Sequence, residues 1–296
     1  MSAIEIVEVG PRDGLQNEAV VFDTATKVQF IERCLSAGVR RVEVASFVNP
    51  KRVPQMADAE AVLQSLRPDA GSYIGLVLNE RGFDRALKTQ VGELNLVVMV
   101  TDTFSLKNQG MTTAEAIAAV AAITPRAKDA GIPVSVTLSA SFGCPYEGEV
   151  DVSRLVDVAT QVAGSGIDEL AIADTIGVAV PRDVHRRLEA VREAVAVPLR
   201  VHVHNTRNTG YASALAAADA GVSVLDASLG GIGGCPFAPR ATGNIATEDL
   251  VFALERSGYE TGLDLDVLCR NSEWLGEQLG RPTPGLVSKA GGFPPA

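Results

Sequence analysis

Short apolar runs rich in Val, Ile and Leu recur along the chain, each followed by a segment with the hydrophobic period of a helix. The eight runs are residues 4–9, 41–47, 73–78, 94–100, 133–138, 169–174, 200–205 and 223–229. Their starting positions lie 21 to 39 residues apart, which is room for one strand and one helix each time. The pattern therefore predicts a repeated strand–helix unit.

The intervening segments carry their own helix signals. Four periodic segments end at or just before a glycine, a common helix C-cap, at residues 24–37, 112–129, 153–163 and 211–220. The strands are nearly continuous in apolar residues, as expected for parallel strands covered by helices. Eight such units in about 250 residues predict an α/β fold, the (β/α)8 TIM barrel. An open doubly wound sheet is the alternative, and the lack of a G-x-G-x-x-G motif after the first strand disfavours it.

No linker or low-complexity stretch divides the sequence. We expect one catalytic domain over residues 1–296, with the barrel at about 4–250 and a short helical extension at about 251–296.

Composition narrows the classes of partner. The chain has 26 Lys and Arg against 36 Asp and Glu, a net charge of −10, which argues against nucleic acid and anionic membrane as partners. It has no apolar run of the roughly 18–20 residues that span a bilayer and no signal-peptide pattern. The four cysteines are sparse and predict no disulfide framework. We expect a cytoplasmic protein, and the sequence leaves a homo-oligomer open.

Polar residues stand where the predicted strands end, which is where TIM barrels carry their chemistry. They are Arg12, Asp13, Glu43, Ser46, Asn79, Thr101, Ser139, Asp174, His202, His204, Asp226 and Ser228. A purely structural barrel would scatter polar groups over both ends, so we expect this gathering on one side to mark an enzyme.

Two of the three histidines, His202 and His204, lie two apart on one predicted strand and therefore face the same way. A core histidine usually only hydrogen-bonds a neighbour, but two on one face beside carboxylates are typical of a metal site. Imidazole suits Zn, Mn, Fe or Co, whereas carboxylate oxygens suit Mg and Mn, so the ion stays open at this point. His185 lies in a polar helical segment and is expected at the surface.

A glycine-rich segment, residues 229–244, contains Cys235. It is either a plain loop with a chance cysteine or a flexible loop that brings a thiol to the substrate, where the thiol could act as general acid or base. Cys144 is a weaker candidate for the same role.

Six motifs together resemble one known family. EVGPRDGLQNE (8–18), VEVASFVNPKRVPQM (42–56), GCPYEG (143–148), ADTIGV (173–178), HVHNT (202–206) and GGCPFAPRATGNIATEDLV (233–251) resemble hydroxymethylglutaryl-CoA lyase, over residues 4 to 268. The resemblance implies a carbon–carbon lyase that cleaves 3-hydroxy-3-methylglutaryl-CoA to acetoacetate and acetyl-CoA in a retro-Claisen reaction. It also implies leucine degradation as the pathway.

The resemblance implies a role for particular residues. A Mg²⁺ or Mn²⁺ ion would be bound by Asp13, His202, His204 and Asn244. Arg12 would stabilise the enolate oxygen, and Cys235 would be the general acid or base. The remaining implied residues are Glu43 and Asp174 in catalysis, Gln16, Ser46 and Asn79 at the substrate, and Glu248 and Asn205 as polar support of the metal ligands.

The sequence departs from the family pattern at two places. Asn205 and Arg207 stand where the family has Asp and Tyr, and Pro239 and Arg240 change the loop after Cys235. We hypothesise that Arg207 or Arg240 binds a substrate carboxylate or the phosphates of the acyl-CoA. One alternative is a lyase for a related 3-hydroxy-3-alkylglutaryl-CoA or another 3-hydroxyacyl-CoA. A further alternative is a non-catalytic binder of metal and acyl-CoA. A condensing synthase of the wider family is disfavoured because few residues follow Glu248.

Overall fold

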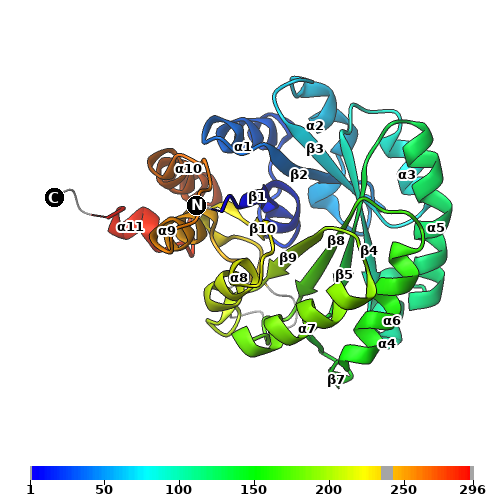
Figure 1. Ribbon diagram of the computed structural model, residues 1–296. Coiled ribbons are helices and arrows are strands. Elements are labelled where there is room, and N and C mark those ends of the chain that lie inside the picture. Colours follow the sequence, from blue (N-terminus) through cyan, green and yellow to red (C-terminus); the bar gives the residue numbers. More distant parts are fainter. Residues whose placement is uncertain (1, 235–242, 294–296) are drawn as a thin grey trace.

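Eight parallel strands close into a barrel in the computed structural model, which describes residues 2–234 and 243–293. The strand order around the barrel is β1-β10-β9-β8-β5-β4-β3-β2 (Figure 1). The strands are β1 (Glu5–Glu8), β2 (Arg41–Ser46), β3 (Ser72–Val77), β4 (Glu93–Met99), β5 (Val134–Ser139), β8 (Glu169–Asp174), β9 (Leu199–Val203) and β10 (Val224–Ala227). All eight predicted strands are thus present within about two residues, and the TIM barrel is confirmed.

Helices surround the barrel because each turns an apolar stripe toward the strands. They are α1 (Thr24–Ser36), α2 (Ala59–Ser65), α3 (Glu80–Ala86), α4 (Asp102–Gln109), α5 (Thr113–Asp129), α6 (Val152–Ala163), α7 (Pro181–Ala194), α8 (Gly210–Asp219) and α9 (Thr247–Arg256). In α6 the buried residues Leu155, Val158, Ala159 and Val162 follow the i, i+3, i+4, i+7 spacing of one helix face. Thr112 and Glu115 form a capping box that fixes the start of α5.

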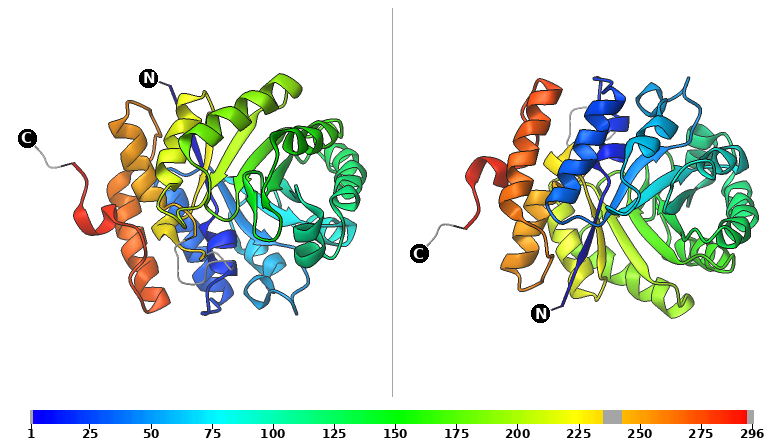
Figure 2. Two further views of the ribbon diagram at one scale, coloured as in Figure 1. Left: turned by 90° about the horizontal axis from the view of Figure 1, so that it is seen from below. Right: turned by 90° about the horizontal axis from the view of Figure 1, so that it is seen from above.

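The chain continues beyond α9 as α10 (Leu265–Leu279) and α11 (Val287–Ala290). α10 packs against α1 and α9, so these helices stand together on one side of the barrel (Figures 1 and 2). A hairpin of β6 (Gly143–Cys144) and β7 (Gly148–Glu149) follows β5 and was not predicted. The single catalytic domain expected over residues 1–296 stays a prediction. Across the described ranges, no helix has both the length and the apolar character needed to cross a bilayer.

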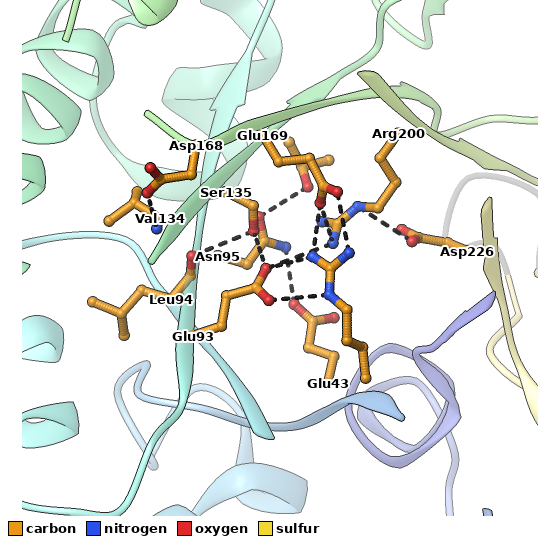
Figure 3. Close-up of polar contacts among 12 residues, drawn as sticks. Glu43, Glu93, Leu94, Asn95, Val134, Ser135, Asp168, Glu169, Arg200 and Asp226 are labelled. Atoms are coloured by element: carbon orange, nitrogen blue, oxygen red, sulfur yellow. Dashed lines mark hydrogen bonds and ion pairs between the residues drawn. The ribbon is translucent and has the colours of Figure 1, made fainter. Parts of the chain in front are cut away.

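The amino-terminal end of the barrel, here called the floor, is filled by charged side chains. Arg41 forms ion pairs with Glu5, Glu93 and Glu169 at 2.9 to 3.1 Å. Arg200, only 1% exposed, contacts Glu169 and the side chain of Asp226 (Figure 3). The expectation that polar groups gather only where the strands end is therefore wrong. All of these residues except Asp226 stand at or next to the start of their strands, and only closure of the barrel brings them together.

Candidate active site

The chain leaves β1 through a single π-helical turn, Gly10–Gly14, at the carboxyl end of the barrel, here called the mouth. The backbone N–H groups of Arg12, Asp13 and Gly14 all point to the carbonyl oxygen of Val9, at 2.7 to 3.2 Å. Such turns are rare and occur often at functional sites. This one places two charged side chains, Arg12 and Asp13, at the mouth.

A chain of side-chain contacts across the barrel holds Arg12 in place. Its Nε donates to Oε2 of Glu43 at 2.6 Å, and its Nη1 lies 2.8 Å from Oδ1 of Asp13. The other oxygen of Glu43 accepts a hydrogen bond from Asn95 Nδ2, and Asn95 Oδ1 accepts one from Thr137. Burial lowers the pKa of Arg12, but the charges of Glu43 and Asp13 outweigh it and keep the guanidinium charged. Glu43 thus fixes the direction of the cation.

Asp13, His202 and His204 offer three ligand atoms that all lie within 4.8 Å of one another. Both imidazoles come from β9 or its end, and their ring centroids are 5.0 Å apart. Asn244 comes from a different part of the chain, and its Nδ2 donates to Asp13 Oδ2 at 2.8 Å. The structure therefore brings together all four residues that the sequence proposed as metal ligands.

The approach of Asn244 needs a glycine at position 233. Gly233 has φ +98°, and a Cβ there would lie 2.7 Å from Asn244 Nδ2 and 2.9 Å from the Cα of Gly14. Any other residue would push the two segments apart. The glycine-rich character of the segment thus has a steric reason at this position.

The electrostatics of the cluster suit a cation. Burial alone would raise the pKa of Asp13, but Arg12 and the two histidines lower it by more. The pKa therefore lies below its usual value, and the carboxylate is ionised. Burial and the neighbouring His202 lower the pKa of His204 to about 3, which leaves that imidazole neutral. Burial lowers the pKa of His202, but the hydrogen bond and the charge of Asp226 raise it more.

The donor set fits a divalent ion. One carboxylate and two imidazoles match the ligands that Mn²⁺ accepts, and the carboxylate also matches Mg²⁺. The amide oxygen of Asn244 would be a further donor to such an ion. His204 is 7% exposed, and its Nδ1 has no hydrogen-bond partner within the described residues, an arrangement that costs free energy unless a ligand compensates for it. The residues present therefore fit the implied ion.

A cavity of about 250 Å³ lies against this cluster. Its lining includes Gln16, Ser46, Thr137 and Ser139 besides the four residues Arg12, Asp13, His202 and His204. The Ser46 hydroxyl is buried and lacks a hydrogen-bond partner within the described ranges. Gln16 and Ser46 thus line the cavity, and their contacts with a substrate stay predictions.

The cavity continues into a larger groove of about 830 Å³, and Gln16 lines both. Asn79 lines this groove and also caps α3, because its Oδ1 accepts the Gly82 N–H at 3.0 Å. Three exposed cations lie along it, Lys51, Arg52 and Arg81. An acidic chain thus carries a basic groove beside the mouth.

Three residues that were predicted to belong to the site make hydrogen bonds with backbone groups of nearby loops. Both oxygens of Asp174 accept N–H groups, from Val178 and Ala179, and burial raises its pKa. Arg207 donates to the carbonyl oxygens of Ile176 and Gly177 at 2.7 and 3.1 Å. The side chain of Asn205 accepts the Gly210 N–H. They shape the loops after β8 and β9, and their proposed contacts with proton, substrate or ligands stay predictions.

Glu248 lies behind the mouth at the start of α9, where it accepts the Gly230 N–H at 2.9 Å. Burial raises its pKa to about 7. Cys144 accepts a hydrogen bond from Thr101 and is buried. Two predicted residues, Cys235 and Arg240, lie outside the described residues, so their roles stay predictions.

The sequence interpretation missed several residues of this region. Glu8 is fully buried and accepts hydrogen bonds from the Gly10 and Leu229 N–H groups and from Thr247. It thereby joins the turn that carries Arg12 to the segment that leads toward Asn244. A polar residue within an apolar strand, Glu8 in residues 4–9 and Asn95 in 94–100, was the available signal.

Known proteins resemble this chain in sequence and in fold. A family model described as HMGL-like matches residues 3–275. An (R)-citramalyl-CoA lyase from Chloroflexus aurantiacus is 43% identical over 98% of this chain and 96% of its own. The mitochondrial hydroxymethylglutaryl-CoA lyase of Mus musculus is 39% identical over 97% and 89% of the two chains. The solved structure of an HMG-CoA lyase from Acinetobacter baumannii, in complex with coenzyme A and 3-methylmalate, has a TM-score of 0.93, 38% identity and coverage of 99% and 98%.

Proposed function

Because the chain belongs to the HMGL-like family, we propose that it is a metal-dependent lyase that cleaves 3-hydroxy-3-methylglutaryl-CoA to acetoacetate and acetyl-CoA. The observation that carries the proposal is the convergence of Arg12 with Asp13, His202 and His204 at one cavity. A cation, a metal-binding set and a cavity beside a basic groove are what retro-Claisen cleavage of an acyl-CoA requires.

In the proposed reaction the 3-hydroxyl loses its proton, the C2–C3 bond breaks, and its electron pair passes to the enolate of acetyl-CoA. A Mg²⁺ or Mn²⁺ ion bound by Asp13, His202, His204 and Asn244 would supply a Lewis acid that makes the hydroxyl more acidic. Arg12, held by Glu43, stabilises the negative charge that develops on the thioester oxygen.

Proton transfer in this proposal belongs to Cys235, which takes the hydroxyl proton and returns a proton to C2 of the enolate. The cavity wall supplies neutral hydrogen-bonding groups, of which Ser46 and Gln16 are the ones assigned to the acyl group. Their role is to hold the C2–C3 bond in one orientation relative to Arg12.

The groove supports a CoA ester as the substrate. Lys51, Arg52 and Arg81 lie along the 830 Å³ space that continues from the cavity, and a CoA ester carries anionic phosphates at the end of a long arm. Arg85, which also lines the groove, is paired with Glu60 at 2.7 Å and fixes its wall.

A second substrate is favoured by one specific observation. The relative from Chloroflexus aurantiacus, 43% identical, is a citramalyl-CoA lyase. Citramalyl-CoA has its carboxylate one methylene closer to the tertiary carbon, so the same bond cleavage yields pyruvate and acetyl-CoA. An enzyme distinguishes two substrates that differ by one methylene by only about 10–200-fold in kcat/KM.

The deciding experiment is a paired assay. Chelator-stripped protein is incubated with hydroxymethylglutaryl-CoA or (R)-citramalyl-CoA, with and without Mg²⁺ or Mn²⁺, and acetyl-CoA, acetoacetate and pyruvate are quantified. We expect metal-dependent release of acetyl-CoA and acetoacetate in equal amounts. A higher kcat/KM for citramalyl-CoA would assign the second substrate, and binding of both esters without products would identify a non-catalytic binder. Asp13→Asn is the inactive control.

A further inference from the structure

The two histidines of the mouth differ in what lies behind them. His202 Nδ1 is 3.1 Å from Oδ2 of Asp226, whereas no described residue makes a hydrogen bond with Nδ1 of His204. Asp226 is 5% exposed and comes from β10, the strand beside β9. Val224 pairs with Arg200 in the register of these strands, so Asp226 lies at the level of His202.

A second charged group lies at ion-pair distance from the other oxygen of Asp226. Arg200 Nε lies 3.3 Å from Oδ1 of Asp226, on the side of the floor, and Figure 3 shows the two side chains pointing toward each other. Arg200, His202 and His204 alternate along β9 and share its inward face. Arg200, Asp226 and His202 therefore form a continuous line of contacts from the floor to the mouth.

We propose that Asp226, held by Arg200, is the positioning residue that makes His202 present Nε2 to the metal. A carboxylate oxygen can only accept a hydrogen bond, so the contact at 3.1 Å requires the proton of neutral His202 on Nδ1. The lone pair of Nε2 is then available to a metal. The choice of ion and its role in catalysis rest on the proposed function. The assignment of the Nδ1–H tautomer to His202 does not.

The Arg200 contact makes an amide a sharp probe of this arrangement. In Asp226→Asn the amide oxygen is expected to face the Arg200 guanidinium, which donates only. The NH₂ group then faces His202 Nδ1, which must accept, and the proton moves to Nε2. The favoured tautomer thus reverses, and Nε2 can no longer bind a metal without losing that proton.

The experiment uses the intact, metal-free chain labelled with [¹⁵N]histidine, which has only three histidines to assign. At alkaline pH we expect ¹⁵N shifts of an Nδ1–H imidazole for His202 in the wild type and of an Nε2–H imidazole in Asp226→Asn. Titration with Mn²⁺ alone, followed by electron paramagnetic resonance, is expected to show a Kd about 10–100-fold weaker in the variant.

Glu169→Gln is the matched control, because it removes another carboxylate, 12% exposed, that touches Arg200 but not His202. We expect it to keep the Nδ1–H tautomer and the wild-type Kd. An Nε2–H tautomer in the wild type, a wild-type Kd in Asp226→Asn, or an equal loss of affinity in both variants would overturn the proposal. Thermal unfolding checks that each variant folds, and if Asp226→Asn does not, the wild-type tautomer decides. These readouts need no substrate, so a protein that fails the lyase assay can still confirm the role of Asp226.

Discussion

The mouth and the floor of this barrel contain the same residue types, but these residues are arranged differently in the two regions. At the floor, Arg41 and Arg200 lie between Glu5, Glu93, Glu169 and Asp226, so the opposite charges compensate one another. At the mouth, Arg12 is paired with Glu43, and one ligand atom each of Asp13, His202 and His204 lies within 4.8 Å of the others. A charged cluster inside a barrel is therefore no mark of function by itself. What separates the two regions is access, because Arg12, Asp13, His202 and His204 line a cavity and Arg41 and Arg200 do not.

The largest effect on stability is expected at the floor. Arg41→Met leaves Glu93 and Glu169 buried without one of their cations, and the free energy of unfolding is expected to fall by about 3–5 kcal/mol. The folded fraction keeps its kcat, because Arg41 does not line the cavity. Urea denaturation measures the loss. Arg126→Met, which breaks two exposed ion pairs, with Glu80 and with Asp84, is the control. It should lower the free energy of unfolding by less than about 1 kcal/mol. Equal losses in the two variants would remove the distinction between buried and exposed pairs.

The largest effect on catalysis is expected at the mouth. Arg12→Gln removes the cation at the enolate oxygen, and kcat is expected to fall on the order of 10²–10³-fold. Steady-state kinetics with the better of the two acyl-CoA substrates measures it, and urea denaturation corrects for any loss of folded protein. A kcat within threefold of wild type would mean that Arg12 is, like Arg41, only structural.

The buried carboxylate of Glu8 differs from those of the mouth and the floor, because its hydrogen-bond partners are neutral. Burial raises the pKa of Glu8 from 4.5 to about 7, and its hydrogen-bond donors are two backbone N–H groups and Thr247. The folded state then holds a proton that the unfolded chain has lost, so the contribution of Glu8 to stability is greatest below pH 4.5, falls as the pH rises to about 7, and is constant above that. In Glu8→Gln this fall is expected to be smaller by up to about 3 kcal/mol, from 1.36 kcal/mol per pKa unit. Denaturant unfolding across this pH range measures it, and an unchanged profile would contradict the assignment.

Metal binding should stabilise the mouth and leave the floor unaffected. At a Mn²⁺ concentration 100 times Kd, the folded wild-type chain is expected to gain about 2.7 kcal/mol. His204→Ala should lose this gain, whereas Arg41→Met should show all of it on a lower baseline. Thermal unfolding with and without Mn²⁺ tests both. A full gain in His204→Ala would move the metal away from the mouth.

The smallest effect concerns the two arginines that depart from the family pattern. Arg207 is exposed and its guanidinium donates to two backbone carbonyls, so we expect the double variant Arg207→Ala, Arg240→Ala to raise KM for the acyl-CoA by less than about tenfold. Steady-state rates over a range of substrate concentrations give KM and kcat separately. If every kinetic constant is unchanged, neither arginine contacts the substrate.

Much of the fold followed from local pattern. The apolar runs predicted all eight strands of the barrel because a strand buried on both faces must be apolar along its length. The hairpin Gly143–Cys144 with Gly148–Glu149 was missed, since two-residue strands are too short to leave a period. The metal-ligand set was predicted in part by spacing, through His202 and His204, and in part by resemblance, through Asn244.

The sequence by itself determined the barrel, the family and the residues that meet at the mouth, because period, glycine position and motif are local properties. Only the tertiary structure decided which charges face one another. Arg41, Glu93, Glu169 and Arg200 are far apart in the chain and look like ordinary strand starts, yet barrel closure joins them in ion pairs. Asp226 likewise gains its role from the register of two neighbouring strands, which places it between Arg200 and His202.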